Sequence, residues 1–329
     1  MKKIRLKDIA QRTGFTANTV SRALKGKKDI SEKTKNYIVG VAKEMGYIPN
    51  NIAGSLRSGR TRTIATIVPD ISDPLIAILL NDIETRLRIN QYNTFIINTE
   101  EKYENEEEAI ILALSKNVDG IILCPTQKKN EDIKMLIRQG TPFVLIGRRF
   151  YDIESDYVIS DDIKGAFLAV DYLLKKGYKK ILFINGPVYI SSALERLEGY
   201  KKALESNGVL YKEELVWESG VTAGNSSMVI KKITDKKIDF DAVFAFSDLM
   251  AWEIIYTLQS LQMQKNKNIP VIGYDNIQSR FFYPFPLTTV NYSKRQIAYQ
   301  TVDILLNKIK GKSQNGYEQH MVETGLIIR

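Results

Sequence analysis

The sequence predicts an α/β protein with two parts, an N-terminal all-α helix-turn-helix domain and a larger two-lobed core of parallel sheets. Three observations lead to this prediction: the length of 329 residues, an uneven charge distribution, and a change of hydrophobic pattern near Thr63. Before Thr63, apolar residues recur at helical spacing. After it, short apolar runs alternate with amphipathic stretches. A chain of this length commonly forms two or three domains.

The positive charge is concentrated in the first 62 residues. They hold 15 lysines and arginines against four acidic residues, a net charge of +11, whereas the remaining 267 residues carry −2. A small basic module of this kind is attracted to nucleic acid, because binding releases counterions from the phosphates. A solubilising tail would carry similar charge, but it would lack the apolar periodicity of this segment.

The composition argues against several other classes of protein. No apolar run approaches the ~18–20 residues that a membrane helix needs. The basic start meets Asp8 and polar residues, which is unlike a signal peptide. The single cysteine, Cys124, has no partner for an internal disulfide and fits a cytoplasmic protein. The single histidine, His320, lies in a polar C-terminal tail and cannot form a zinc site of two histidines, so we expect no metal and no cofactor.

Three short helices are predicted in the basic head. The first helical face ends at Gly14. Thr16 is a suitable N-cap for a second helix over Ala17–Leu24, and a third helix starts at Ser31 and ends near Gly46. A tight turn between the first two helices is typical of a helix-turn-helix unit.

The strings TVSRALKG, GYIPN and LRSGRT follow one another in the head and the segment after it. In this order they resemble the LacI/GalR family of bacterial transcriptional regulators, and the resemblance covers essentially the whole chain. It implies a body with the fold of periplasmic binding proteins. It also divides the chain into a DNA-binding domain over residues 1–49, a hinge helix or linker over 50–60, and an effector-binding and dimerisation core over 61–329.

The core is expected to consist of two discontinuous lobes. Short apolar strands separated by helices imply parallel sheets with right-handed crossovers. The first lobe is predicted over residues 61–160 and 291–318, and the second over 161–290 and 319–329. The division is discontinuous because the late helix Lys294–Lys310 should return to the first lobe.

The resemblance places the second helix in the major groove of DNA, with Thr16, Ala17, Asn18, Ser21 and Arg22 as DNA-binding residues. Ala17 and Asn18 match positions where the family varies its operator preference, and Arg22 matches a guanine contact. The Arg22 fork fits O6 and N7 of guanine, and the Asn18 amide suits adenine. Thr16 and Ser21 suit phosphate contacts or caps. A solvated helix position is the alternative for Asn18.

Residues 50–60, NNIAGSLRSGR, link the head to the body. Alone they are too short and polar to hold a helix in water. In the family this segment becomes helical only on operator DNA and inserts a leucine into the minor groove, and Leu56 is the matching residue. Gly54 departs from the family pattern and costs about 1 kcal/mol relative to Ala in a helix. We therefore expect a more costly ordering of this segment.

Polar residues gather where the body's strands end, which is where open parallel sheets bind ligands. Carboxylates and arginines there can bracket neighbouring hydroxyls of a carbohydrate. The residues predicted to bind the effector are Asp73, Arg148, Asp162, Arg196, Asp248 and Asp275. Arg196 and Asp275 rest on the family resemblance, which places an effector-facing arginine and a sugar-gripping carboxylate at these positions.

Four of these predictions have structural alternatives. Asp73, Asp162 and Asp248 lie beside predicted helix starts and would serve equally well as N-caps. Arg148 stands next to Arg149, and the two would also form a solvated pair or a salt link between the lobes.

The sequence thus predicts a cytoplasmic, homodimeric repressor of carbohydrate-utilisation genes. Its partners would be double-stranded operator DNA and a small sugar or sugar phosphate, with allosteric control and no membrane partner. The sequence contains no Walker A loop, dinucleotide fingerprint or Gly-x-Ser-x-Gly elbow, so we do not expect an enzyme. The alternative is a catabolite-control regulator gated by a phosphorylated carrier protein. A solute-binding transport component is disfavoured by the start of the chain and the lone thiol.

Overall fold

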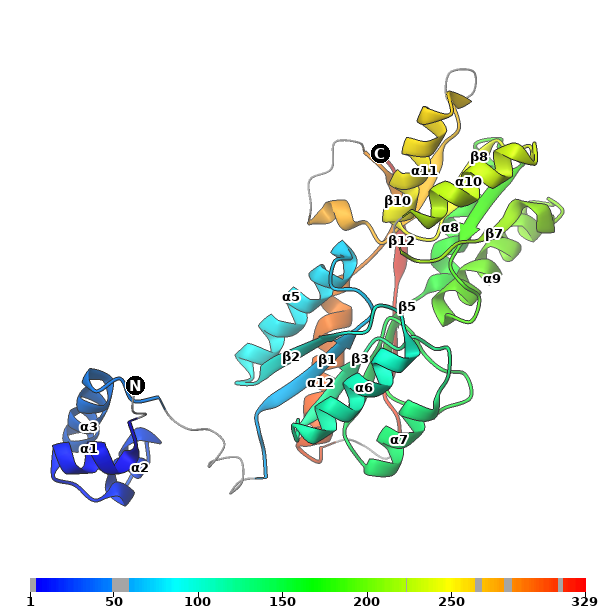
Figure 1. Ribbon diagram of the computed structural model, residues 1–329. Helices are drawn as coiled ribbons and strands as arrows, with labels where there is room; N and C mark the ends of the chain where they lie inside the picture. The colour runs from blue at the N-terminus through cyan, green and yellow to red at the C-terminus, as the bar shows by residue number, and fades with distance from the viewer. Residues whose placement is uncertain (1–3, 49–58, 223, 264–267, 281–285, 313–315) are drawn as a thin grey trace. The chain divides into compact units, whose positions relative to one another are not determined.

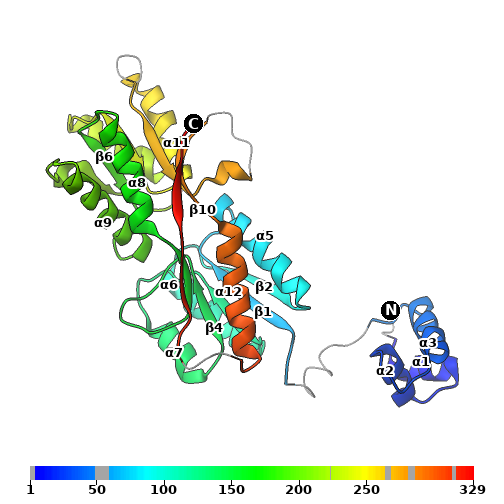
Figure 2. The same ribbon diagram turned by 180° about the vertical axis from the view of Figure 1, so that it is seen from behind.

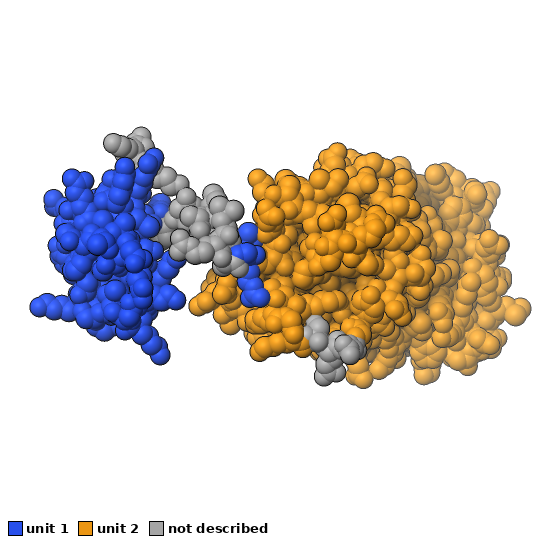
Figure 3. Space-filling view, turned by 90° about the horizontal axis from the view of Figure 1, so that it is seen from below, with its two compact units in different colours: residues 1–61 blue, residues 62–329 orange. Residues whose placement is uncertain are grey.

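The computed structural model describes residues 4–48, 59–222, 224–263, 268–280, 286–312 and 316–329 (Figure 1). The chain divides into two compact units, residues 1–61 and 62–329, which Figure 3 colours separately. Most of the linker predicted over 50–60, including Leu56, lies outside the described residues. Among those that are described, no helix is both long and apolar enough to cross a membrane.

The head contains the three predicted helices, α1 (Leu6–Thr13), α2 (Ala17–Leu24) and α3 (Glu32–Glu44). Helix α2 begins where its N-cap predicts, because the Thr16 hydroxyl accepts a hydrogen bond of 3.1 Å from the Thr19 amide. Helix α1 begins differently. Its N-cap, Arg5, has no hydroxyl, and the Asp8 carboxylate in the first turn instead accepts a 2.8 Å hydrogen bond from the Arg5 amide.

One apolar residue set from all three helices forms the core of the head. Ile9 of α1, Val20 and Ala23 of α2, and Ile38 and Ala42 of α3 are buried against one another. This packing fixes α2 by one side only, so its other side is free to present polar side chains.

The first lobe of the body is a six-stranded sheet with helices on both faces. Its strands are β1 (Thr63–Val68), β2 (Asn93–Asn98), β3 (Gly120–Leu123), β4 (Phe143–Ile146), β5 (Tyr157–Ser160) and β11 (Gln319–Val322). They lie in the order β11-β5-β4-β3-β1-β2, and all neighbours are parallel. Its helices are α5 (Pro74–Ile89), α6 (Tyr103–Ser115), α7 (Glu131–Gln139) and α12 (Lys294–Ile309).

The second lobe repeats this plan with one antiparallel edge. Its strands are β6 (Ile181–Asn185), β7 (Val216–Glu218), β8 (Ala242–Ala245), β9 (Val271–Tyr274), β10 (Thr288–Tyr292) and β12 (Thr324–Ile327). They lie in the order β12-β10-β9-β8-β6-β7, and only the β10–β12 pair is antiparallel among these described strands. Its helices are α8 (Asp162–Lys175), α9 (Ser191–Ser206), α10 (Asn225–Asp235) and α11 (Asp248–Ser260), with two short 3₁₀ helices, η1 (Glu213–Leu215) and η3 (Ile277–Ser279).

The chain crosses between the lobes three times, after β5, after β10 and between β11 and β12. The prediction that the second lobe includes all of residues 319–329 is wrong, because residues 319–322 pair with β5 in the first lobe. His320 is accordingly part of strand β11 and not of an irregular tail. The sequence does not reveal this strand because it is a four-residue edge strand in which only Val322 is buried.

Helix α12 returns to the first lobe, as predicted from the sequence. It packs along α5 (Figure 2). At this contact the guanidinium of Arg86 forms a bidentate pair with Asp303 at 2.6 and 2.8 Å. The chain leaves β5, β10 and β11 at their carboxyl ends to cross between the lobes, so the carboxyl ends of the parallel strands in both lobes face the three crossings. This arrangement places the strand-end side chains of the two lobes opposite one another.

Candidate functional site

The face of α2 opposite the core carries the predicted DNA-binding residues. Thr16, Ala17, Asn18 and Arg22 are exposed and Ser21 is partly buried. Because the Thr16 hydroxyl caps the helix, the capping alternative holds for this residue. The other four side chains, three polar and the methyl group of Ala17, form one face about two turns long, which suits the major groove in width and chemistry.

The Arg22 guanidinium is paired in the isolated chain. Its Nη2 lies 2.5 Å from Asp29 Oδ2, and both side chains are about half exposed, at 47% and 48%. The hydrogen bond from Arg22 holds the pKa of Asp29 below its usual range. Exposed ion pairs contribute little net stability, so opening this pair would cost little free energy.

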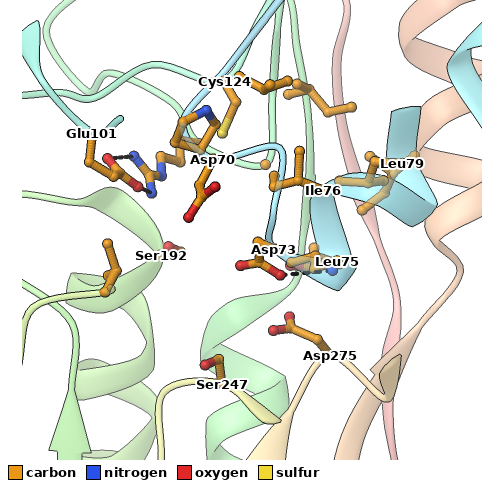
Figure 4. A pocket seen from close by; sticks show the side chains of 18 of the residues that line it. Asp70, Asp73, Leu75, Ile76, Leu79, Glu101, Cys124, Ser192, Ser247 and Asp275 are labelled. Carbon is orange, nitrogen blue, oxygen red and sulfur yellow. Dashed lines mark hydrogen bonds and ion pairs between the residues drawn. The ribbon is translucent and has the colours of Figure 1, made fainter. Parts of the chain in front are cut away.

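The two lobes of the body enclose a cavity of about 120 Å³. At about 10–15 Å³ for one water, this is room for a small ligand. Four of the six predicted effector residues line it, namely Asp73, Arg148, Arg196 and Asp275. Figure 4 shows Asp73 from the first lobe and Asp275 from the second with their carboxylates directed into the same space.

Arg196 is held rigidly in the wall of the cavity. Its Nε donates to Asp162 at 2.8 Å and its Nη1 donates to the carbonyl oxygen of Phe246. The guanidinium also lies over the Tyr274 ring, 3.5 Å from its centroid. Burial disfavours its charged form, but the neighbouring acids, Asp162 first, raise the pKa of Arg196 above its usual value. A planar cation with a fixed orientation can address two hydroxyl oxygens at once.

Asp275 stands on strained backbone at the end of β9. Its φ is 102° and that of Asn276 is 47°, a conformation that side-chain-bearing residues rarely adopt. Such strain costs about 1–3 kcal/mol and is concentrated at binding sites. Tyr292 donates a 3.0 Å hydrogen bond to Asp275 Oδ1 and fixes the carboxylate. Burial raises the pKa of Asp275, with Arg196 opposing that shift.

Asp73 combines two roles. Its Oδ1 accepts a 2.8 Å hydrogen bond from the Leu75 amide, so it is the N-cap of α5, as the structural alternative stated. The same side chain also lines the cavity. Burial, followed by the charge of Asp275, raises the pKa of Asp73 to about 7.

Asp162 and Asp248 are not among the described residues that line the cavity, so no contact in the structure supports the predicted effector role of these two residues. Asp162 holds Arg196 in place, and Asp248 accepts hydrogen bonds from Thr289 Oγ1 at 2.5 Å and the Ile277 amide at 2.8 Å. Burial raises the pKa of Asp248 to about 7.

The alternative of a helix cap is also wrong for Asp162 and Asp248. Each is the first residue of its helix, and the residues before them, Asp161 and Ser247, are the N-caps of α8 and α11.

Arg148 and Arg149 have different partners. Arg148 lines the cavity and forms a bidentate pair with Glu101 of the same lobe, at 2.5 and 3.0 Å. Arg149 links the lobes, with its Nε and Nη2 3.0 and 2.8 Å from Glu195 on α9. The alternative of a lobe-bridging salt link thus applies to Arg149, and neither arginine is a solvated surface residue.

Several residues of the cavity wall were not predicted from the sequence, including Glu101, Ser160, Ser192 and Thr222. Glu101 and Ser160 follow or end strands β2 and β5, so a complete survey of strand ends would have found them. Thr222 follows β7, a strand of only three residues that the sequence pattern does not reveal. Ser192 lies on the first turn of α9 and not at the end of a strand, so a survey of strand ends would not have found it.

Comparisons with known proteins agree on one family. Residues 61–325 match the model for the periplasmic binding proteins and sugar binding domain of the LacI family, and residues 5–50 match that for bacterial regulatory proteins of the lacI family. The repressor PurR of Vibrio vulnificus is 28% identical over 318 residues, 96% of this chain and 95% of PurR. The repressor CytR of Escherichia coli is 28% identical over 324 residues, 98% of this chain and 95% of CytR.

Solved structures show the same architecture. A complex of the transcriptional regulator CelR with cellobiose superposes with a TM-score of 0.75 at 26% identity, covering 99% of both chains. A Lac repressor dimer bound to operator and an anti-inducer superposes with a TM-score of 0.86 at 22% identity, covering 100% of this chain and 98% of that one. The head, the two-lobed body and these similarities together show that this chain belongs to the lacI family of bacterial regulatory proteins, which are DNA-binding transcriptional repressors and not enzymes.

Proposed function

We propose that this protein is a homodimeric, cytoplasmic repressor of carbohydrate-utilisation genes that binds a pseudo-palindromic operator and responds to a small carbohydrate. The observation that carries the proposal is one chain with both an exposed polar face on a basic helix-turn-helix and a polar cavity between two lobes. The CelR–cellobiose complex and the operator-bound Lac repressor dimer, which share this architecture, support both halves of it.

Control would arise from the position of the cavity. A ligand that touches Asp73 and Arg148 in one lobe and Arg196 and Asp275 in the other favours the closed arrangement of the lobes. In a dimer, a change of closure alters the placement of the two linkers, residues 50–60, and so of the two heads. Leu56 is the proposed minor-groove contact of each linker. Binding at the cavity and at DNA would thus be coupled through one conformational equilibrium.

The DNA-binding half is tested by replacing Arg22. An operator is first selected from random duplexes with the full-length protein, and binding is then measured for Arg22→Ala. Loss of a bidentate guanine contact should weaken binding by roughly tenfold to a hundredfold and relax the preference at one base pair. Arg138→Ala, the same substitution on exposed α7 of the body, is the matched control. Equal operator affinity and preference in wild type and Arg22→Ala would refute the assignment.

The effector half is tested by titrating the operator complex with sugars. A sugar that releases or strengthens the complex, and that loses its effect in Asp275→Asn, supports carbohydrate control. A response only to a phosphorylated carrier protein would instead support the catabolite-control alternative.

A further inference from the structure

Both arginines of the cavity are already neutralised by carboxylates of the protein. Arg148 is paired with Glu101 through two hydrogen bonds, and Arg196 lies 2.8 Å from Asp162 and 3.9 Å from Asp275. All five side chains are 15% exposed or less, so salt and solvent screen these pairs weakly. Neither guanidinium therefore offers an uncompensated positive charge to a ligand.

Acidic side chains outnumber basic ones in the described lining of the cavity. Two arginines face four carboxylates, a net charge of −2 when all are ionised: Asp70, Asp73, Glu101 and Asp275. Lys294 stands outside this lining, with its ammonium 3.3 Å from the carbonyl oxygen of Tyr292. A phosphate or carboxylate in the cavity would meet like charge at short range.

The carboxylates of Asp73 and Asp275 face each other from the two lobes (Figure 4). When both are ionised, carboxylates in this arrangement repel each other, which contributes to the raised pKa of Asp73, and a hydrogen-bond donor between them relieves the repulsion. Hydroxyl groups supply such donors without adding negative charge. A ligand with several hydroxyls can therefore relieve the repulsion and join the lobes at the same time.

An apolar wall completes the cavity. Leu75, Ile76, Leu79 and Ile83 of α5 all line it. Apolar walls with a few directed polar groups are typical of small-molecule sites and suit the carbon face of a sugar ring or an apolar substituent on it.

We propose that this cavity takes a hydroxyl-rich ligand without negative charge and rejects phosphorylated or carboxylated forms of the same ligand. This inference rests on the proposed function, in which the cavity holds the controlling ligand, and it decides between a sugar and a sugar phosphate. A phosphate group should weaken binding by at least about tenfold, since it places like charge beside buried carboxylates.

The first experiment uses inorganic phosphate as a probe. The rise in Tm of the full-length protein on adding phosphate, against chloride at equal ionic strength, is compared among wild type, Glu101→Gln and Glu101→Gln/Arg148→Met. Glu101→Gln leaves Arg148 without its carboxylate, so its rise should exceed that of wild type. The double variant should match wild type, because both retain only the contribution of the basic head.

Two results of this experiment would overturn the proposal. A larger rise in wild type than in the double variant would show that the cavity already binds phosphate through Arg148. Equal rises in all three proteins would show that the Arg148–Glu101 pair does not exclude anions.

The second experiment uses wild type alone and so does not depend on the folding of any variant. Calorimetric titrations compare glucose, ribose and cellobiose with their phosphates. Tighter binding of the neutral member, by about tenfold or more, supports the inference, and equal or tighter binding of a phosphate overturns it. Failure of the proposed function has a different signature, a sugar that binds but leaves operator affinity unchanged. In that case the charge preference is still measured.

Discussion

At the level of single residues, several side chains that line the cavity also have structural roles. Asp73 caps α5, and Asp275 is held by Tyr292 on strained backbone. A carboxylate with fixed protein partners cannot turn away when a ligand arrives, so little rotamer freedom is lost on binding. The same fixation keeps the two acids near each other in the absence of ligand, at a cost to stability that depends on pH.

Asp73→Asn should change the pH dependence of stability. The folded-state pKa of Asp73, about 7, exceeds its ordinary value of 3.8. Between these values the folded state binds more protons than the unfolded state, so the unfolding free energy falls as pH rises from about 4 to 7. The variant lacks this titration, and its stability relative to wild type should rise across that window by on the order of 1–3 kcal/mol. Urea unfolding at several pH values measures the difference.

Asp161→Asn is the control for the loss of a capping carboxylate, because Asp161 caps α8 and does not line the cavity. Parallel pH profiles for wild type and Asp73→Asn would contradict the prediction.

At the level of helices and strands, the second lobe depends on the close approach of α8 and α9. Gly199 of α9 makes this approach possible, since a Cβ there would overlap the carbonyl oxygen of Ile163 and lie 2.9 Å from Ala166 Cβ. The contact places α9 so that Arg196 reaches the cavity and Glu195 reaches the first lobe. Helix packing therefore determines where both functional side chains lie.

Gly199→Ala should destabilise the body by about 1–3 kcal/mol, because the added methyl group meets backbone that cannot move away.

For Gly40→Ala, the same substitution in the head, we expect the opposite effect on stability. Gly40 lies inside α3, and a methyl group added there would meet no atom within 4 Å apart from its chain neighbours and the backbone of its own helix, so alanine should stabilise the head by up to about 1 kcal/mol. Hydrogen exchange in each unit during urea unfolding separates the two effects. Destabilisation by both substitutions, or by neither, would contradict this account.

At the level of the whole body, polar contacts hold the lobes together on two sides of the cavity. On one side Glu195 pairs with Arg149 and accepts from Tyr151, and the Arg149 amide donates to Ser191. On the other side Arg280 lies 3.0 Å from Asp82 of α5. Because the chain crosses between the lobes only at short segments, these contacts set the balance between open and closed forms.

Glu195→Gln should favour opening of the lobes. The amides of Arg149 and Ser191 donate to partners in the opposite lobe, so their hydrogen exchange reports opening directly. We expect exchange at these two amides to accelerate by about tenfold, which corresponds to about 1.4 kcal/mol. The amide of Leu145, which bonds within the first lobe, should be unchanged.

Glu198→Gln is the matched control for this prediction. It is the same substitution on the same helix, but Glu198 pairs with Lys202 on the surface. Equal acceleration in both variants would indicate general loosening of α9 and would argue against a link between the lobes.

The organisation of the chain follows from its sequence alone. The spacing of apolar residues and the N-cap at Thr16 predicted α2 to the residue, and the alternation of short strands and helices predicted the two lobes. These features are local, because period, caps and breakers act within a few residues. Four strands were not predicted, β7, β10, β11 and β12. Strands β7, β11 and β12 are edge strands of three or four residues, too short to show a pattern. Strand β10 is an interior strand, but three of its five residues are Thr or Asn, so it lacks the apolar run of the other interior strands.

The role of each strand-end side chain, in contrast, depends on the folded arrangement of both lobes. Asp73, Arg148, Arg196 and Asp275 were predicted as effector residues and line the cavity, whereas Asp162 and Asp248 have the same local signal but serve partners behind its wall. The neutralisation of Arg148 by Glu101 joins residues 47 positions apart. A side chain's charge environment depends on what the fold brings beside it from distant parts of the chain, and no short-range pattern in the sequence records that.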